Sequence, residues 1–228
     1  VSQVRFHHPL VLGVQEALKH QLDEIDKAFP EYQYIGVGRD DGGDTGEFSA
    51  IFYDSTKLRL LNQGTFWLSP TPAVPSKGWD AALNRICTFG LFQPRAGAPF
   101  WVFNTHFDHV GTHARVASAQ LILDQIEEKN SDNYPIILMG DLNLTPDTPP
   151  IQLLAKTLRD TYTTAAYPPL GPAGTFTGFS WEAIVDRRID YLFVSEQIAT
   201  LKTAILTDSR DKRYPSDHFP VIAHLRLE

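Results

Sequence analysis

The sequence predicts an α+β protein in which mixed β-sheets pack face to face and helices cover their outer sides. Two observations carry this prediction: many short apolar runs of strand length, and far fewer segments with helical periodicity. The composition is that of a folded chain, because 43% of the 228 residues are hydrophobic and 21% are charged. The length fits one large domain, which we expect to span residues 1–228.

The strand predictions rest on runs that are continuously apolar or that alternate between apolar and polar residues. The segment 135–140 (PIILMG) is apolar throughout, which is typical of a strand covered on both faces. The predicted strands are 10–15, 48–53, 58–67, 86–92, 100–106, 135–140, 189–194 and 219–225.

Three segments predict helices. Residues 17–29 and 112–128 repeat apolar residues at helical spacing, and 150–158 follows Thr148, a possible N-cap, with proline in its first turn. Segments 69–78 and 168–174 are rich in Pro and Gly, so we interpret them as long loops within the domain.

Composition excludes several classes of protein. No apolar run approaches the length of a membrane span, and the single cysteine, Cys87, excludes a disulfide framework. The net charge of −7 does not favour non-specific binding to long nucleic acids, but it allows a small phosphorylated substrate held by a metal ion. No targeting signal and no obligate protein partner are evident, and the cellular compartment stays open.

Acidic, histidine and asparagine side chains recur at the ends of the predicted strands. Each alone has a structural explanation, such as an acid at a helix N-terminus, a half-buried histidine or a turn. Together they indicate a site at one rim of the sheets, where strand ends converge. These residues are Glu16, His106, Asp108, Asp141, Asn143, Asp190, Asp217 and His218.

The set suits the transfer of a phosphoryl group to water. Carboxylate and amide oxygens, here Glu16, Asp141, Asn143 and Asp217, are ligands that Mg²⁺ or Mn²⁺ prefers. A histidine held by a carboxylate can polarise water or stabilise an oxygen in the transition state. We expect two such pairs, Asp190 with His218 and Glu47 with His106; no serine-nucleophile motif GxSxG is present, which favours direct attack by water.

In this order, the motifs VQE, GEFSAIFY, NTHFDH, GDLN, RIDYLFVS and SDHFPV resemble those of the endonuclease/exonuclease/phosphatase superfamily over nearly the whole chain. The resemblance implies a four-layer α/β/β/α sandwich of two mixed β-sheets with helices outside. It also implies a metal-dependent hydrolase of phosphate esters, in a family that includes deoxyribonucleases, deadenylases and inositol phosphatases.

The resemblance also implies roles for single residues. Glu16 corresponds to the metal ligand and Asp217 to a further metal-site carboxylate, while Asp141 and Asn143 position the attacking water and contact phosphate. His218, oriented by Asp190, and His106, paired with Glu47, correspond to the two catalytic histidines. Whether Asp141 or His218 is the general base stays open.

One departure from the family pattern concerns the start of the chain. Family members begin with a strand that carries an Asn before the VQE motif, and only 15 residues precede Glu16 here. We therefore expect this N-terminal strand to be missing, with weaker metal binding and lower stability than in a chain that contains it.

Substrate-binding residues are harder to predict. Arg85 begins a predicted strand beside the long loop 68–80 and is our candidate for a phosphate contact, although a solvated surface arginine fits equally well. We add Asp108 at a strand end, and Trp79, which would stack on a base or headgroup or simply pack. The function expected is a Mg²⁺- or Mn²⁺-dependent phosphodiesterase; the alternatives are a nuclease or 3′ deadenylase acting on nucleic acid, and a non-catalytic binding module.

Overall fold

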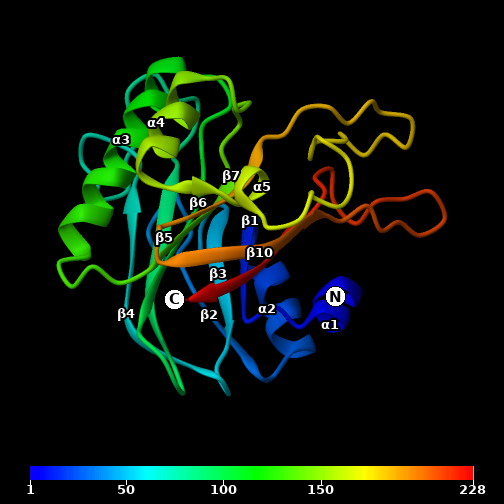
Figure 1. Cartoon of the computed structure of the whole chain (residues 1–228). Helices are drawn as coiled ribbons and strands as arrows, with labels where there is room; N and C mark the ends of the chain where they lie inside the picture. The colour runs from blue at the N-terminus through cyan, green and yellow to red at the C-terminus, as the bar shows by residue number, and fades with distance from the viewer. Residues whose placement is uncertain (228) are drawn as a thin grey trace.

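The computed structural model describes residues 1–227 and confirms the four-layer α/β/β/α sandwich (Figure 1). One inner layer is a six-stranded sheet with the order β4-β5-β6-β7-β9-β8. The facing layer contains a three-stranded sheet, β1-β3-β2, and a two-stranded sheet, β10-β11. The strands of the six-stranded sheet are β4 (Leu58–Trp67), β5 (Ile86–Pro94), β6 (Phe100–His106), β7 (Ile136–Asp141), β8 (Arg159–Asp160) and β9 (Asp190–Val194). Those of the facing layer are β1 (Val11–Ala17), β2 (Tyr32–Ile35), β3 (Phe48–Asp54), β10 (Ile198–Ile205) and β11 (Val221–Leu227).

Three apolar clusters hold the layers together. The helices α3 (Thr112–Lys129) and α4 (Pro149–Thr157) pack on the outer face of the six-stranded sheet, and α2 (Lys19–Ala28) covers the outer face of β1-β3-β2 (Figure 1). Side chains such as Ile51, Phe92 and Val102 fill the space between the two sheet layers. The short helices α1 (Ser2–His7) and α5 (Thr161–Thr164) were not predicted, nor were β2, β8 and β10.

Strand register brings the first site residues together. The strands β6 and β7 are parallel and pair His106 with Asp141, and the antiparallel pair β7 and β9 places Asp141 opposite Asp190. Gly140 makes the close β6–β7 approach possible, because a Cβ there would lie 1.9 Å from the carbonyl oxygen of Thr105 and its φ is +146°. Three polar side chains therefore stand on adjacent strands at one end of the sheet.

The facing sheet contributes Glu16 through an irregularity. The pairing of β1 with β3 shifts register between Val14 and Ala17, and Glu16 within this bulge has a φ of +59°. A bulge re-aims a side chain, and a left-handed conformation is uncommon for glutamate. Among the described residues, no helix is both long enough and apolar enough to cross a membrane.

Candidate active site

A cavity of about 170 Å³ opens at this end of the sandwich. Of the eleven residues that the sequence nominates, the structure brings seven together in its wall. They are Glu16, Arg85, His106, Asp141, Asn143, Asp217 and His218. The other wall residues are His109, Phe176, Arg187 and Ile189.

The Asp190–His218 pair has the geometry expected from the sequence. The Nδ1 atom of His218 lies 2.8 Å from Oδ2 of Asp190, so the carboxylate fixes the ring and turns Nε2 toward Asp141, 3.9 Å away. Burial alone would lower the pKa of His218, but the hydrogen bond and the charge of Asp190 outweigh burial and raise it to about 9. His218 is therefore a cation at neutral pH in this geometry.

Asp141 lies between the two histidines. One of its oxygens accepts the backbone N–H of Asn143 at 2.8 Å, and the other lies 3.4 Å from Nε2 of His106. Burial raises the pKa of Asp141, and the nearby charge of Asp190 raises it further. A buried carboxylate with a raised pKa is suited to accept a proton.

His106 is buried and neutral. Burial lowers the pKa of His106 well below its ordinary value, and the charges of Arg85 and Arg39 act in the same direction. The side-chain amide of Asn143 donates to Nε2 of His106 at 3.1 Å and to the carbonyl of Phe107 at 3.1 Å. Because Nε2 accepts this bond, the proton of the neutral ring is on Nδ1.

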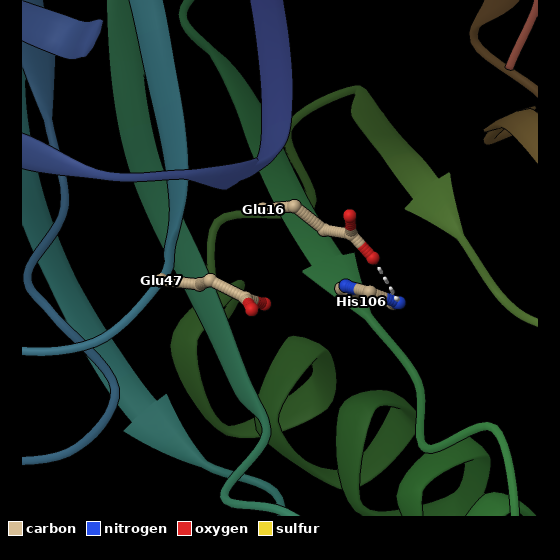
Figure 2. A group of neighbouring side chains, drawn as sticks. All are labelled: Glu16, Glu47 and His106. Carbon is tan, nitrogen blue, oxygen red and sulfur yellow. Dashed lines mark ion pairs between the residues drawn. The ribbon is translucent and has the colours of Figure 1, made fainter. Parts of the chain in front are cut away.

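We expected Glu47 to pair with His106, but the principal contact of Glu47 is with another residue. The carboxylate of Glu47 forms an ion pair with Arg39, while Nε2 of His106 lies 3.8 Å from Glu16. Figure 2 shows Glu16 and Glu47 approaching His106 from different segments, with the dashed line drawn only between Glu16 and His106. Glu47 lies near His106, but its charge is balanced by Arg39. No sequence pattern indicated that Arg39 would contact Glu47.

The acidic residues of the site fit a divalent cation. Burial raises the pKa of Glu16, and the negative charges of Glu47 and Asp217 add to this effect. Carboxylates that converge and repel one another are stabilised by a hard cation, and the oxygen donors here are those that Mg²⁺ or Mn²⁺ takes. Two groups of described side chains bring their ligand atoms within 4.8 Å of one another and could hold an ion: Glu16, Glu47 and His106, and Asp141, Asp190 and His218. Asp217, which we expected as a metal ligand, lies in the cavity wall but belongs to neither group.

Comparison with known proteins identifies the family. Residues 1–218 match the model of the Endonuclease/Exonuclease/phosphatase family. The chain belongs to this family. Members of this family are phosphoric ester hydrolases, which agrees with the class of protein that the sequence predicts.

Solved structures with high similarity include two bacterial proteins. Mannosyl-6-phosphatase Bt3783 of Bacteroides thetaiotaomicron is 42% identical, with a TM-score of 0.95 over 99% of this chain and 88% of that chain. A functionally unknown conserved protein of Enterococcus faecalis is 36% identical, with a TM-score of 0.92 over 100% of this chain and 89% of that chain. The human Nocturnin catalytic domain shares the fold at 18% identity and a TM-score of 0.78, over 100% of this chain and 84% of that chain.

Among curated relatives, the uncharacterized protein L388 of Acanthamoeba polyphaga mimivirus is 30% identical over 170 residues, which are 70% of this chain. Protein angel of Drosophila melanogaster is 33% identical over 129 residues, 53% of this chain. These matches span 60% of the length of L388 and 34% of the length of angel.

In this family member, Arg85 reaches the cavity from the start of β5. One of its terminal nitrogens, Nη2, donates to Nδ1 of His109 at 3.0 Å, and its Nε lies 3.5 Å from Asp108. Asp108 itself is buried and lines neither this cavity nor the smaller one beside it. Its two oxygens accept the backbone N–H groups of Ala82, Leu83, Val110 and Gly111. Asp108 therefore contacts the backbone of two loops and the side chain of Arg85, and not the cavity.

Trp79 lies outside both cavities. It packs near His113 of α3, with 6.1 Å between the ring centroids, and the neighbouring Asp80 accepts the backbone N–H groups of His113 and Ala114. The loop therefore anchors the start of α3, and nothing places Trp79 at the substrate.

Two residues of the site were missed by sequence reasoning, Arg39 and His109. Arg39 follows a glycine in the segment 36–46, which has no hydrophobic period, and reaches the site only through tertiary folding. His109 is the last residue of the NTHFDH motif, and that position was the available signal.

Proposed function

We propose that this protein is a divalent-metal-dependent phosphatase that removes phosphate from a small phosphate monoester, such as a sugar phosphate. The observation that carries the proposal is the placement of Asp141 between His106 and His218 in one cavity with Glu16 and Asp217. The sequence favoured a phosphodiester substrate; we place the monoester first because of the 42% identity with a mannosyl-6-phosphatase. The diester becomes the alternative.

In this proposal each residue has a separate role in hydrolysis. Asp141 accepts a proton from the attacking water, while His218, charged and oriented by Asp190, stabilises the charge that develops on the phosphoryl oxygens. Asn143 fixes the ring of His106 at the cavity wall. A divalent cation at Glu16 would supply positive charge beside the phosphate. The P–O ester bond breaks and the leaving oxygen takes up a proton, which gives an alcohol and inorganic phosphate.

The test is hydrolysis of p-nitrophenyl phosphate with Mg²⁺, with Mn²⁺ or with EDTA. We expect turnover that EDTA abolishes and that added metal restores. His218→Asn should lower kcat by about 100-fold or more, since the loss of one group that stabilises transition-state charge costs about 10²–10³-fold. The matched control is His20→Asn, because His20 is exposed on α2 and lies outside both cavities. Full activity in EDTA, or in His218→Asn, would contradict the proposal.

A further inference from the structure

A second, much smaller cavity lies next to the main one. Its volume is about 10 Å³, which is room for about one water-sized group. It shares Glu16, Arg85 and His106 with the main cavity, and Arg39, Glu47 and Ser49 belong to its wall. It therefore adjoins the place where a substrate phosphate would lie.

The wall of this small cavity has hydrogen-bond donors without acceptors. The side-chain Nε of Arg39, and Nε and Nη1 of Arg85, are buried and have no hydrogen-bond partner among the described residues. Arg39 is 8% exposed and Arg85 is 4% exposed. A buried donor without an acceptor is costly, so a group that brings an acceptor into this space is favoured.

The charges around the small cavity also favour an anionic group inside it. Arg39 and Arg85 both line this cavity. Burial lowers the pKa of Arg85, and the positive charge of Arg39 lowers it further. Glu47 pairs with one nitrogen of Arg39 and Asp108 approaches one nitrogen of Arg85. Nε of Arg39 and Nη1 of Arg85 have no hydrogen-bond partner among the described residues, and an anionic oxygen in the cavity would offer them an acceptor.

We infer that the cavity between Arg39 and Arg85 receives one terminal oxygen of a phosphomonoester and thereby selects monoesters over diesters. A phosphomonoester has three terminal oxygens, of which one can enter a space of this size. A diester keeps two such oxygens but carries a single negative charge, whereas a monoester at neutral pH carries about two, so a cavity lined by two guanidinium groups favours the monoester. This inference rests on the proposed function and names the residues that set its substrate class.

The test uses two esters with the same leaving group, p-nitrophenyl phosphate and methyl p-nitrophenyl phosphate. In the full chain, Arg39→Gln removes a buried charged donor, and Ser49→Thr adds one methyl group beside the small cavity, where Ser49 is 2% exposed. We expect each change to lower the monoester-to-diester ratio of kcat/KM by about tenfold. Arg39→Gln removes a hydrogen bond to a charged group, which is among the stronger ones in proteins, and the methyl group of Ser49→Thr takes up space that the oxygen needs. The diester rate should change much less.

Arg188→Gln is the matched control. Arg188 is also buried, at 6% exposure, and also ion-paired, to Asp160 at 2.6 Å, but it lines neither cavity. Its loss should leave the monoester-to-diester ratio unchanged. Urea midpoints of all variants separate a change of selectivity from a loss of folded protein.

Binding of inorganic phosphate, measured by titration calorimetry, separates this inference from the proposed function. If the wild type hydrolyses neither ester with Mg²⁺ or Mn²⁺, the proposed function fails; phosphate affinity that is lost in Arg39→Gln then still supports the oxygen site. If monoester and diester rates fall in parallel in folded Arg39→Gln and Ser49→Thr, the inference is overturned. The cavity would then hold only a structural water, while phosphatase activity itself would stand.

Discussion

Replacing Asp108 with asparagine tests whether this carboxylate holds the rim of the site together. Its Oδ2 accepts the backbone N–H groups of Gly111 at 2.7 Å and of Val110 at 3.0 Å. Its Oδ1 accepts those of Ala82 at 3.1 Å and of Leu83 at 3.3 Å. Asparagine has one acceptor oxygen, so two of these four N–H groups would face an amide NH₂ and lose their partner.

The magnitude follows from those two lost acceptors. An unsatisfied buried donor costs about 1–3 kcal/mol, so Asp108→Asn should lower the free energy of unfolding by about 2–6 kcal/mol. With an m-value of about 1–3 kcal/mol per molar urea, the urea midpoint should fall by about 1 M or more. The urea midpoint is measured by monitoring tryptophan fluorescence during unfolding in urea.

The difference in the free energy of unfolding between wild type and Asp108→Asn should depend on pH in one direction. Burial acts to raise the pKa of Asp108, but the hydrogen bonds from Gly111, Ala82 and Val110 outweigh it and hold the pKa well below its ordinary value. A carboxyl group whose pKa is lowered by folding contributes its full stability above its unfolded pKa of about 3.9 and loses it as the pH falls further. The gap between wild type and Asp108→Asn should be constant from pH 8 to 5 and shrink only below about pH 4.

Asp124→Asn is the control for Asp108→Asn, since Asp124 is exposed on α3 and accepts one side-chain bond, from Gln120. It should change stability by less than about 0.5 kcal/mol. An Asp108→Asn protein as stable as this control would refute the reasoning from backbone acceptors.

Four further results are expected. Gly140→Ala should lower the free energy of unfolding by more than about 2 kcal/mol in urea, since its Cβ would collide with the carbonyl of Thr105; an unchanged midpoint would contradict this. Thr175→Val should cost about 1–3 kcal/mol and lower kcat, because its hydroxyl accepts the N–H of Asp190 and of the residue before it; full kcat would argue against it. The thiol of Cys87, which is 0% exposed and whose pKa burial raises, should resist Ellman's reagent until urea is added, and rapid labelling of native protein would refute this. Mg²⁺ at about 100 times its Kd should stabilise the fold by about 2.7 kcal/mol and raise Tm by several degrees relative to EDTA; equal Tm values would contradict a bound cation.

The sequence predicted the parts of the site that follow from strand ends and register. His106, Asp141 and Asp190 each terminate or begin an apolar run, and sheet pairing places such residues side by side. The short strand β2 has four residues, and β8 has two, so periodicity could not reveal either.

Contacts between segments far apart in the chain were not predictable in the same way. Glu47 lies near His106 but forms its ion pair with Arg39, and the carboxylate of Asp108 accepts backbone N–H groups from two loops. Both outcomes depend on which polar atoms meet after folding, and a pattern of residue types does not contain that information. The sequence therefore indicated which residues gather at the rim better than which atoms they contact.

The geometry of the Asp190–His218 pair depends on one buried threonine that joins a loop to the sheet. Asp190 is held by the register of β7 and β9, whereas His218 belongs to the segment between β10 and β11. Figure 1 shows this segment as a long loop that projects from the sandwich. The backbone carbonyl of Thr175 accepts the N–H of Phe219 at 2.7 Å, and its side-chain hydroxyl accepts the N–H of Asp190 at 3.2 Å. Thr175 is 0% exposed, so these bonds are shielded from competing water. Because the same residue holds both the histidine segment and the strand that carries its carboxylate partner, the distance between His218 and Asp190 is fixed by buried backbone bonds as well as by their own contact.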